Sequence, residues 1–177
     1  MQRELIRRIT KIAMFSALMC VSAMIYIPAP IPITAQTFLL FLALFTLGGR
    51  DGSIATLIYI SIGCLGLPVF SGFSGGFSRI LEPTGGYILG MLFASLAFWL
   101  FEKFLPKTKV TEILSPAISM LVIYTFGTLW FTFLHTTGEK SLIFILTTCV
   151  IPFLIPDALK IIFARIVARK ITAAIKE

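Results

Sequence analysis

Residues 12–49 read IAMFSALMCVSAMIYIPAPIPITAQTFLLFLALFTLGG and contain no Asp, Glu, Lys or Arg. A helix that crosses the hydrocarbon core of a bilayer needs about 20 predominantly apolar residues. This run is therefore long enough for two membrane segments, and the prolines at positions 28, 30 and 32 separate them because proline interrupts a helix. Further charge-free runs follow at residues 52–78, 83–101, 113–138 and 141–156. The pattern predicts a helical protein that crosses the membrane several times.

The composition of the chain supports the same conclusion. Of its 177 residues, 58% are hydrophobic and 13% are charged, and the mean hydropathy is +0.99. A soluble domain carries about 25% charged residues, so this chain has too few charges to cover its apolar groups in water. We expect residues 1–177 to form a single integral membrane domain, without a catalytic module and without a cleavable signal peptide.

We predict six membrane segments. Their approximate bounds are Ile6–Ile27, Thr34–Leu47, Ser53–Leu67, Gly85–Phe104, Ser115–His135 and Asp157–Ile175. The predicted connections include a turn at residues 48–52, a Gly/Ser/Phe loop at residues 68–83 and a short helix at Ser141–Ile151. We expect Pro116 in the first turn of the fifth segment and Pro156 at the start of the sixth, because proline is favoured there.

The distribution of basic residues predicts the orientation. Of the 15 Lys and Arg residues, only Arg79 and Lys140 fall in loops on one side, while Lys160 lies within a membrane segment. Cytoplasmic loops carry an excess of Lys and Arg, so both termini are expected in the cytoplasm. A net charge of +7 could indicate a protein that binds nucleic acid, but the same clustering of basic residues argues against that function.

Uncommon features converge on the predicted external side. Gln36 follows the proline-rich turn, and a glycine-rich loop leads to Gly85, Gly86 and Tyr87 at a helix N-terminus. Asp157 and Lys160 are three residues apart and therefore share one face of the last helix. Charges at this depth are costly and usually face a partner or a cavity.

Each feature has a simple structural alternative. Asp157 and Lys160 could be only an ion pair near a helix end, and the loop could be a flexible surface segment. Gln36 and Tyr87 could anchor helices at the membrane interface. The ligand-site hypothesis instead has Asp157 and Lys160 gripping a polar ligand, while Phe70, Phe73 and Phe77 close over it as an apolar lid.

The first segment and the cysteines indicate less. Ala13 and Ala17 are small residues four apart, a spacing that permits close helix packing within the chain or against another subunit. Cys20, Cys64 and Cys149 have no metal-ligand spacing and are expected to be buried thiols. The sequence contains no G-x-x-x-x-G-K-[ST] phosphate loop, so ATP-driven function would need a partner.

The sequence contains IPITAQT at residues 31–37, GCLGLPVF at 63–70, PTGGY at 83–87 and PFLIPDALK at 152–160. These motifs, spread along nearly the whole chain, resemble the BioY family, the biotin-binding S components of energy-coupling-factor (ECF) transporters. The resemblance implies an all-α membrane protein, a six-helix S-component bundle that binds biotin near the outer surface of a bacterial cell membrane. The sequence departs from the family pattern at Glu82, where glycine is expected before the proline.

The resemblance also implies site residues and partners. Together with the features above, it gives a predicted biotin site formed by Asp157, Lys160, Gln36, Ser71, Ser74, Gly85, Gly86 and Tyr87. It implies that the glycine-rich loop acts as a lid and that Ala13 and Ala17 contact a transmembrane coupling subunit, which binds two ATPase subunits. No cofactor or metal is expected, and the chain is expected to be a transport subunit without enzymatic activity.

Two other functions are compatible with parts of the sequence. Gly72-Phe73-Ser74-Gly75 has the form of the Gly-x-Ser-Gly motif of rhomboid proteases, with His135 as a candidate base for Ser74. A secondary transporter or channel subunit for another small solute is the third hypothesis, because intramembrane charges alone do not exclude it.

Overall fold

The computed structural model describes residues 2–27, 33–106, 108–134 and 142–176 of the chain. In order along these residues, the elements are α1 (Gln2–Ser22), β1 (Tyr26–Ile27), β2 (Ile33–Thr34), α2 (Gln36–Leu47), α3 (Gly49–Cys64), α4 (Phe77–Leu81), α5 (Gly85–Phe104), α6 (Lys109–Leu134), α7 (Leu142–Cys149) and α8 (Ile151–Lys176). The structure is thus a helical bundle, and its two strands form only a small antiparallel ribbon.

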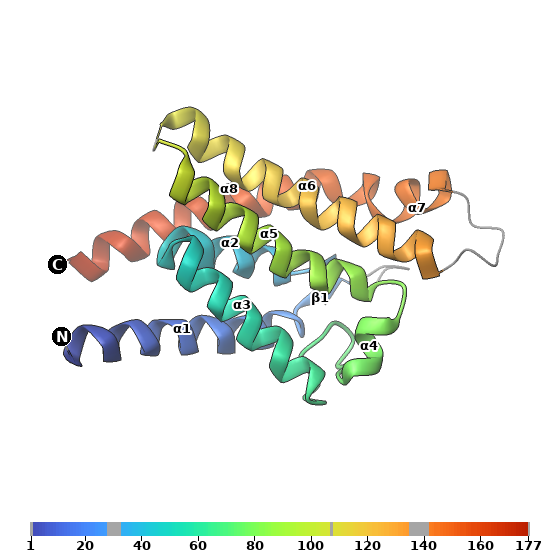
Figure 1. Cartoon of the computed structure of the whole chain (residues 1–177), viewed down its shortest axis with the longest axis horizontal. Coiled ribbons are helices and arrows are strands. Elements are labelled where there is room, and N and C mark those ends of the chain that lie inside the picture. The colour runs from blue at the N-terminus through green and yellow to red at the C-terminus, as the bar shows by residue number, and fades with distance from the viewer. Residues whose placement is uncertain (1, 28–32, 107, 135–141, 177) are drawn as a thin grey trace.

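The long helices run roughly along one axis, and both termini lie at the same end of it (Figure 1). The helix α4, the ribbon and α7 lie at the opposite end (Figure 1). Because α5 and α6 are joined by a short turn, they pack side by side as an antiparallel pair, while α8 packs mainly on α2 and α1 packs on α3 and α2. We call the end with the termini the terminal end and the other the cavity end.

Among the described residues, three stretches are long and apolar enough to cross a membrane. They are Gly85–Phe104, Lys109–Leu134 and the α7–α8 stretch Leu142–Ala174. The helix α2 is apolar but has only 12 residues, and α1 carries several charges in its first half. The helical membrane fold is confirmed, and the number of six spans stays a prediction.

Two helices begin earlier than predicted and contain an internal proline. The predicted start of the last helix at Pro156 was wrong, because α8 begins at Ile151 and includes Pro156. Likewise α6 begins at Lys109, so that Pro116 lies inside the helix and outside its first turn. Proline has no N–H and leaves the carbonyl four residues earlier without its helical bond.

The structure supplies a substitute for the bond lost at Pro116. The carbonyl left over is that of Glu112, and Nη1 of Arg165 on α8 donates to it at 2.9 Å. The same guanidinium also forms an ion pair with the Glu112 carboxylate. A side chain from a neighbouring helix thus makes an internal proline tolerable here.

Other boundaries also differ from the sequence prediction. The first helix ends at Ser22, before the predicted Ile27, and the chain then enters β1. The predicted turn at residues 48–52 is much tighter, since α2 ends at Leu47 and α3 begins at Gly49. Gly48 makes this turn with a φ of 83°, a conformation that favours glycine. The proline-rich turn itself, residues 28–32, lies outside the described residues.

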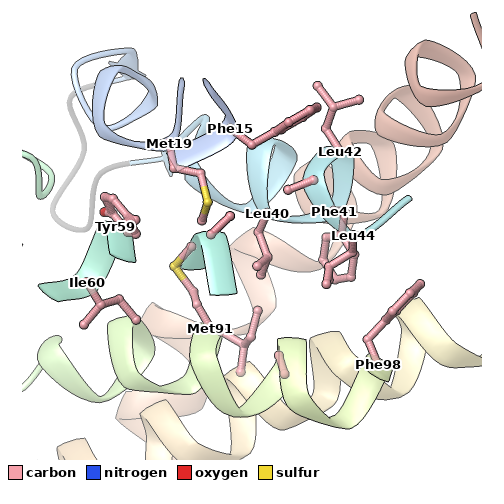
Figure 2. Close-up of a cluster of buried hydrophobic side chains, with 14 of the residues drawn as sticks. Phe15, Met19, Leu40, Phe41, Leu42, Leu44, Tyr59, Ile60, Met91 and Phe98 are labelled. Carbon is pink, nitrogen blue, oxygen red and sulfur yellow. The ribbon is translucent and has the colours of Figure 1, made fainter. Parts of the chain in front are cut away.

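A shared hydrophobic core joins α1, α2, α3 and α5 (Figure 2). Leu40 and Phe41 on α2 are fully buried and lie between residues of α1 and α5, among them Met19 and Met91 (Figure 2). Burial of a large apolar side chain contributes about 1.5–3 kcal/mol relative to its exposed state in water. The core therefore fixes α2 against its neighbours. It thereby also fixes the position of Gln36, the predicted site residue with which α2 begins.

The helices α5 and α6 approach each other closely through glycines. A Cβ at Gly86 would collide with the side chain of Trp130, and one at Gly127 would collide with the ring of Tyr87. Larger residues at these points would push the helices apart. This close packing sets where the first turn of α5 lies relative to α6.

Candidate functional site

A cavity of about 550 Å³ lies at the cavity end, between the start of α2, the α4–α5 connection, α6, α7 and the start of α8. Ligand pockets in proteins typically have about 300–1,000 Å³, so this one suits a small molecule. Its lining comprises Thr34, Gln36, Thr37, Ser71, Arg79, Glu82, Pro83, Thr84, Tyr87, Ile88, Met91, Ile123, Tyr124, Phe131, Phe144, Thr148, Cys149, Phe153, Asp157 and Lys160.

Asp157 and Lys160 form an ion pair at the floor of this cavity. Lys160 Nζ lies 2.7 Å from Asp157 Oδ1. Asp157 is only 4% exposed, and the Lys160 side chain is 18% exposed. Both residues lie on the α8 face that meets α2 and the cavity, because they are separated by nearly one helical turn. The predicted pairing of the two residues on one helix face is confirmed.

Hydroxyl groups from two other helices complete the surroundings of the Asp157 carboxylate. Thr37, in the first turn of α2, donates to Oδ1 at 2.9 Å, and Tyr124 on α6 donates to Oδ2 at 2.8 Å. Lys160 also donates to the hydroxyl of Thr37 at 3.2 Å. Burial of a charge is tolerable when it is paired and hydrogen-bonded, so these contacts hold both ions in place.

Gln36 connects the cavity with the glycine-rich loop. Its side-chain carbonyl accepts a bond from Thr34 at 2.8 Å, and its Nε2 donates to the hydroxyl of Tyr59 on α3. Tyr59 in turn donates to the carbonyl of Val69 in the loop at 3.2 Å. Gln36 also lines the cavity, and its amide carries a second N–H donor.

The rim of the cavity carries a second ion pair. Arg79 lies in the short helix α4 and forms an ion pair with Glu82, the residue that follows this helix. The two side chains are 29% and 46% exposed. Ser71, in the preceding loop, lines the same rim. The unexpected charge at Glu82 is thus paired with a residue of its own segment.

The structure places three of the predicted site residues away from the cavity lining. Gly85 is buried against the backbone carbonyl of Ile80, and Gly86 is buried against Trp130. Ser74 donates to the carbonyl of Ser71 at 2.8 Å and pairs with Phe70 through a β-bridge. These contacts give all three residues a packing role in shaping the site.

The three phenylalanines proposed as a lid occupy different environments. Phe70 is 1% exposed and packs edge-on against Tyr59 with ring centroids 5.8 Å apart. Phe73 and Phe77 are exposed. In the described structure none of the three lines the cavity. Phe70 therefore anchors the loop to α3, while the other two lie on the surface.

The small residues of α1 are on two sides of that helix. Ser16 is buried and donates to the carbonyl of Ala55 on α3 at 3.2 Å. Ala13 and Ala17 are exposed. Packing within this chain thus involves Ser16, and the Ala13–Ala17 surface is available for a partner. Of the cysteines predicted to be buried, Cys149 is buried, whereas Cys20 and Cys64 are half-buried.

Several lining residues were missed by the sequence analysis. Thr37 directly follows Gln36, and Tyr124 lies in the middle of a charge-free run. Tyrosine at such depth normally needs a hydrogen-bond partner, which is the one signal that could have indicated Tyr124. Thr37 gave no such signal, because threonine readily satisfies its hydroxyl within its own helix.

The bundle and its cavity define a class of protein: a helical membrane protein with a ligand-sized cavity over a buried acid–amine pair. Residues 1–177 match the BioY family, and the chain belongs to this family.

Relatives and a solved structure agree with this assignment. The BioY protein of Pyrococcus horikoshii is 39% identical over 93% of this chain and 96% of its own. The biotin transporter BioY of Thermotoga maritima is 31% identical over 93% and 95%. A crystal structure of the S-component for biotin from an ECF-type ABC transporter superposes with a TM-score of 0.83, at 22% identity, over 97% of this chain and 93% of that one. The chain therefore has the ECF S-component fold.

Proposed function

We propose that this chain is the biotin-binding S subunit of an ATP-driven importer. Biotin binds in the cavity at the outer face of the membrane and is delivered to the cytoplasm. The observation that carries the proposal is the buried Asp157–Lys160 pair at the cavity floor, held by Thr37 and Tyr124. The names of the relatives support biotin as the ligand.

The floor of the cavity has the polarity that the ring of biotin needs. The ureido group of biotin carries two N–H donors and one carbonyl acceptor and has no net charge. A carboxylate has about four lone-pair sites, and the described residues use three of them at Asp157; an ammonium has three donors, and the same residues use two of them at Lys160. The remaining acceptor and donor therefore match a ureido N–H and the ureido carbonyl.

The walls of the cavity suit the rest of the molecule. Apolar side chains line it on three sides, with Met91 from α5, Ile123 from α6 and Phe153 from α8. Such surfaces bury the sulfur-containing ring and the aliphatic chain of biotin through the hydrophobic effect. Gln36 and Tyr87, at the segment ends, supply further polar contacts.

The orientation and the partners are part of the proposal. Basic residues gather at the terminal end, which we assign to the cytoplasm; the described ones are Arg3, Arg7, Arg8, Lys11, Arg50, Lys103, Lys109, Arg165, Arg169 and Lys170. The exposed Ala13–Ala17 surface of α1 would bind the transmembrane coupling subunit. The two ATPase subunits supply the energy, since the sequence has no phosphate loop.

Calorimetric titration of the purified chain with biotin tests the ligand. We expect tight binding by the native chain and a loss of at least a hundredfold in Asp157→Asn, which also leaves Lys160 without its counter-ion. Asp51→Asn is the matched control, because it breaks an ion pair with Arg8 at the terminal end. Failure of the native chain to bind biotin would refute the assignment.

A protease function has less support. Ser74 is hydrogen-bonded to the Ser71 carbonyl and does not line the cavity, and the candidate base His135 lies outside the described residues. Membrane vesicles that lack any ATPase distinguish transport driven by an ion gradient from the proposed ATP-driven import. Uptake of biotin by such vesicles under a proton or sodium gradient would favour a secondary transporter.

A further inference from the structure

The cavity lining contains two ion pairs with different surroundings, and this difference indicates which of them binds the carboxylate of the ligand. The inference rests on the function proposed above. Among the described lining residues the charged side chains are Asp157 and Lys160 at the floor and Arg79 and Glu82 at the rim. Biotin carries one carboxylate, which needs a cationic partner if it leaves bulk water.

The floor is a poor place for this carboxylate. Lys160 Nζ is already 2.7 Å from Asp157 Oδ1 and 3.2 Å from the Thr37 hydroxyl. A ligand carboxylate at the remaining donor would lie close to the buried Asp157 carboxylate, and like charges repel strongly where water is scarce. The Lys160 donor that no described residue uses therefore suits a neutral carbonyl.

The rim has the opposite properties. Glu82 is 46% exposed on its side chain, so it can exchange Arg79 for water at little cost, since exposed ion pairs contribute about 0–1 kcal/mol. Arg79 is less exposed, at 29%, and lines the cavity. Guanidinium groups bind carboxylates through two parallel hydrogen bonds, which gives them geometric specificity.

We propose that Arg79 is the carboxylate-binding residue of this cavity and that Glu82 occupies its guanidinium until an acidic ligand displaces it. The neutral ring of the ligand then lies over the Asp157–Lys160 pair, and its acid end lies at the rim. Glu82 acts as an internal competitor, which lowers the affinity for acids without affecting neutral analogues.

The test compares biotin with its neutral carboxamide, which has the same ring and chain. Calorimetry on the full chain in detergent should show that the native protein prefers the acid by roughly tenfold to a hundredfold, as expected for hydrogen bonds to a charged group. In Arg79→Gln the acid should bind only as tightly as the amide, while the amide affinity stays at the native value. The unchanged amide affinity also shows that the variant is folded.

Three further variants sharpen the result. Glu82→Gln should bind biotin up to about fivefold more tightly and leave amide binding unchanged. Asp51→Asn, which breaks an ion pair with Arg8 at the terminal end, should leave both affinities unchanged. Lys160→Met should weaken the binding of both ligands and retain the preference for biotin over its carboxamide.

The outcomes separate this inference from the function on which it rests. Binding of neither ligand by the native chain would refute biotin as the cargo. Tight binding of both ligands without a preference would overturn the role of Arg79 alone. So would a preference for the acid that persists in Arg79→Gln or that disappears in Lys160→Met.

Discussion

The two ends of the bundle both use ion pairs, but they place them differently. At the terminal end, Arg8 pairs with Asp51 and Arg165 pairs with Glu112, so that each pair joins two helices and is partly exposed. At the cavity floor the pair Asp157–Lys160 lies within one helix and is almost buried. Neutral hydroxyls join it to α2 and α6.

This difference shows how the same chemistry serves two purposes. An exposed ion pair between two helices contributes modestly to stability, and each of its charges serves only to bind the other. A buried pair costs desolvation energy that its mutual attraction barely repays, so it is weak support for stability. In the proposed function the pair tolerates this cost because it offers an acceptor and a donor to a ligand in the cavity that both residues line.

The largest effect is expected from Asp157→Ala. Removal of one partner from a buried pair costs about 3–5 kcal/mol because the other charge loses its compensation. Thermal unfolding in detergent should show a strong loss of stability, and biotin binding should disappear. The double variant Asp157→Asn with Lys160→Met should recover much of the stability without recovering binding. If Asp157→Ala were as stable as the native chain, this result would contradict the burial of the ion pair.

Tyr124→Phe is expected to have the next largest effect. It removes a 2.8 Å bond to the Asp157 carboxylate and keeps the ring. Hydrogen bonds to charged groups contribute about 1.5–3 kcal/mol, so the unfolding free energy should fall by this amount. Tyr87→Phe is the comparison, since its hydroxyl lies 3.5 Å from that of Thr128, and it should lose clearly less. Equal losses would mean that the carboxylate does not depend on Tyr124.

Gly86→Ala separates packing from ligand contact. The added Cβ would collide with Trp130, and such overpacking typically costs about 1–3 kcal/mol. Gly90→Ala, one turn further along α5, brings its Cβ to 3.1 Å from the Ile123 carbonyl and should cost less. Thermal unfolding of both variants gives the measurement. A Gly86→Ala variant of native stability that has lost only biotin affinity would assign Gly86 to the ligand instead.

The smallest effect is expected at the terminal end. Asp51→Asn breaks a pair whose side chains are 38% and 18% exposed, so the stability should fall by no more than about 1 kcal/mol. The difference from the native chain should shrink as salt is added, because salt screens exposed charges. A loss as large as that of Asp157→Ala would remove the contrast between the two ends.

The sequence predicted best the parts of the fold that depend on uninterrupted apolar runs. The helix α5 spans the predicted residues 85–104, and α2 ends at the predicted Leu47. The predicted starts of α6 and α8 were late because an internal proline was taken as a boundary. A proline is tolerated when another group takes over the vacated carbonyl, as Arg165 does at Glu112, and local sequence does not show this.

The site was predictable to the extent that its residues are unusual for a membrane segment. Asp157 and Lys160 are noticeable because charges are rare at that depth, and both line the cavity. Thr37 and Tyr124 were missed because their role depends on contacts with a residue more than thirty positions away. Gly85 and Gly86 appeared to be backbone contacts for a ligand, whereas helix packing occupies the space above them.

The bond between Arg165 and the Glu112 carbonyl has a mechanical consequence. Helix α8 packs mainly on α2, and side-chain bonds join it to α6 at two levels, through Glu112 at one end and through Tyr124 and Asp157 at the other. Any separation or hinge bending of these two helices must break a bond at one of these levels. These bonds therefore oppose separation of the two helices and favour a site in which Tyr124 and Asp157 are positioned before a ligand binds.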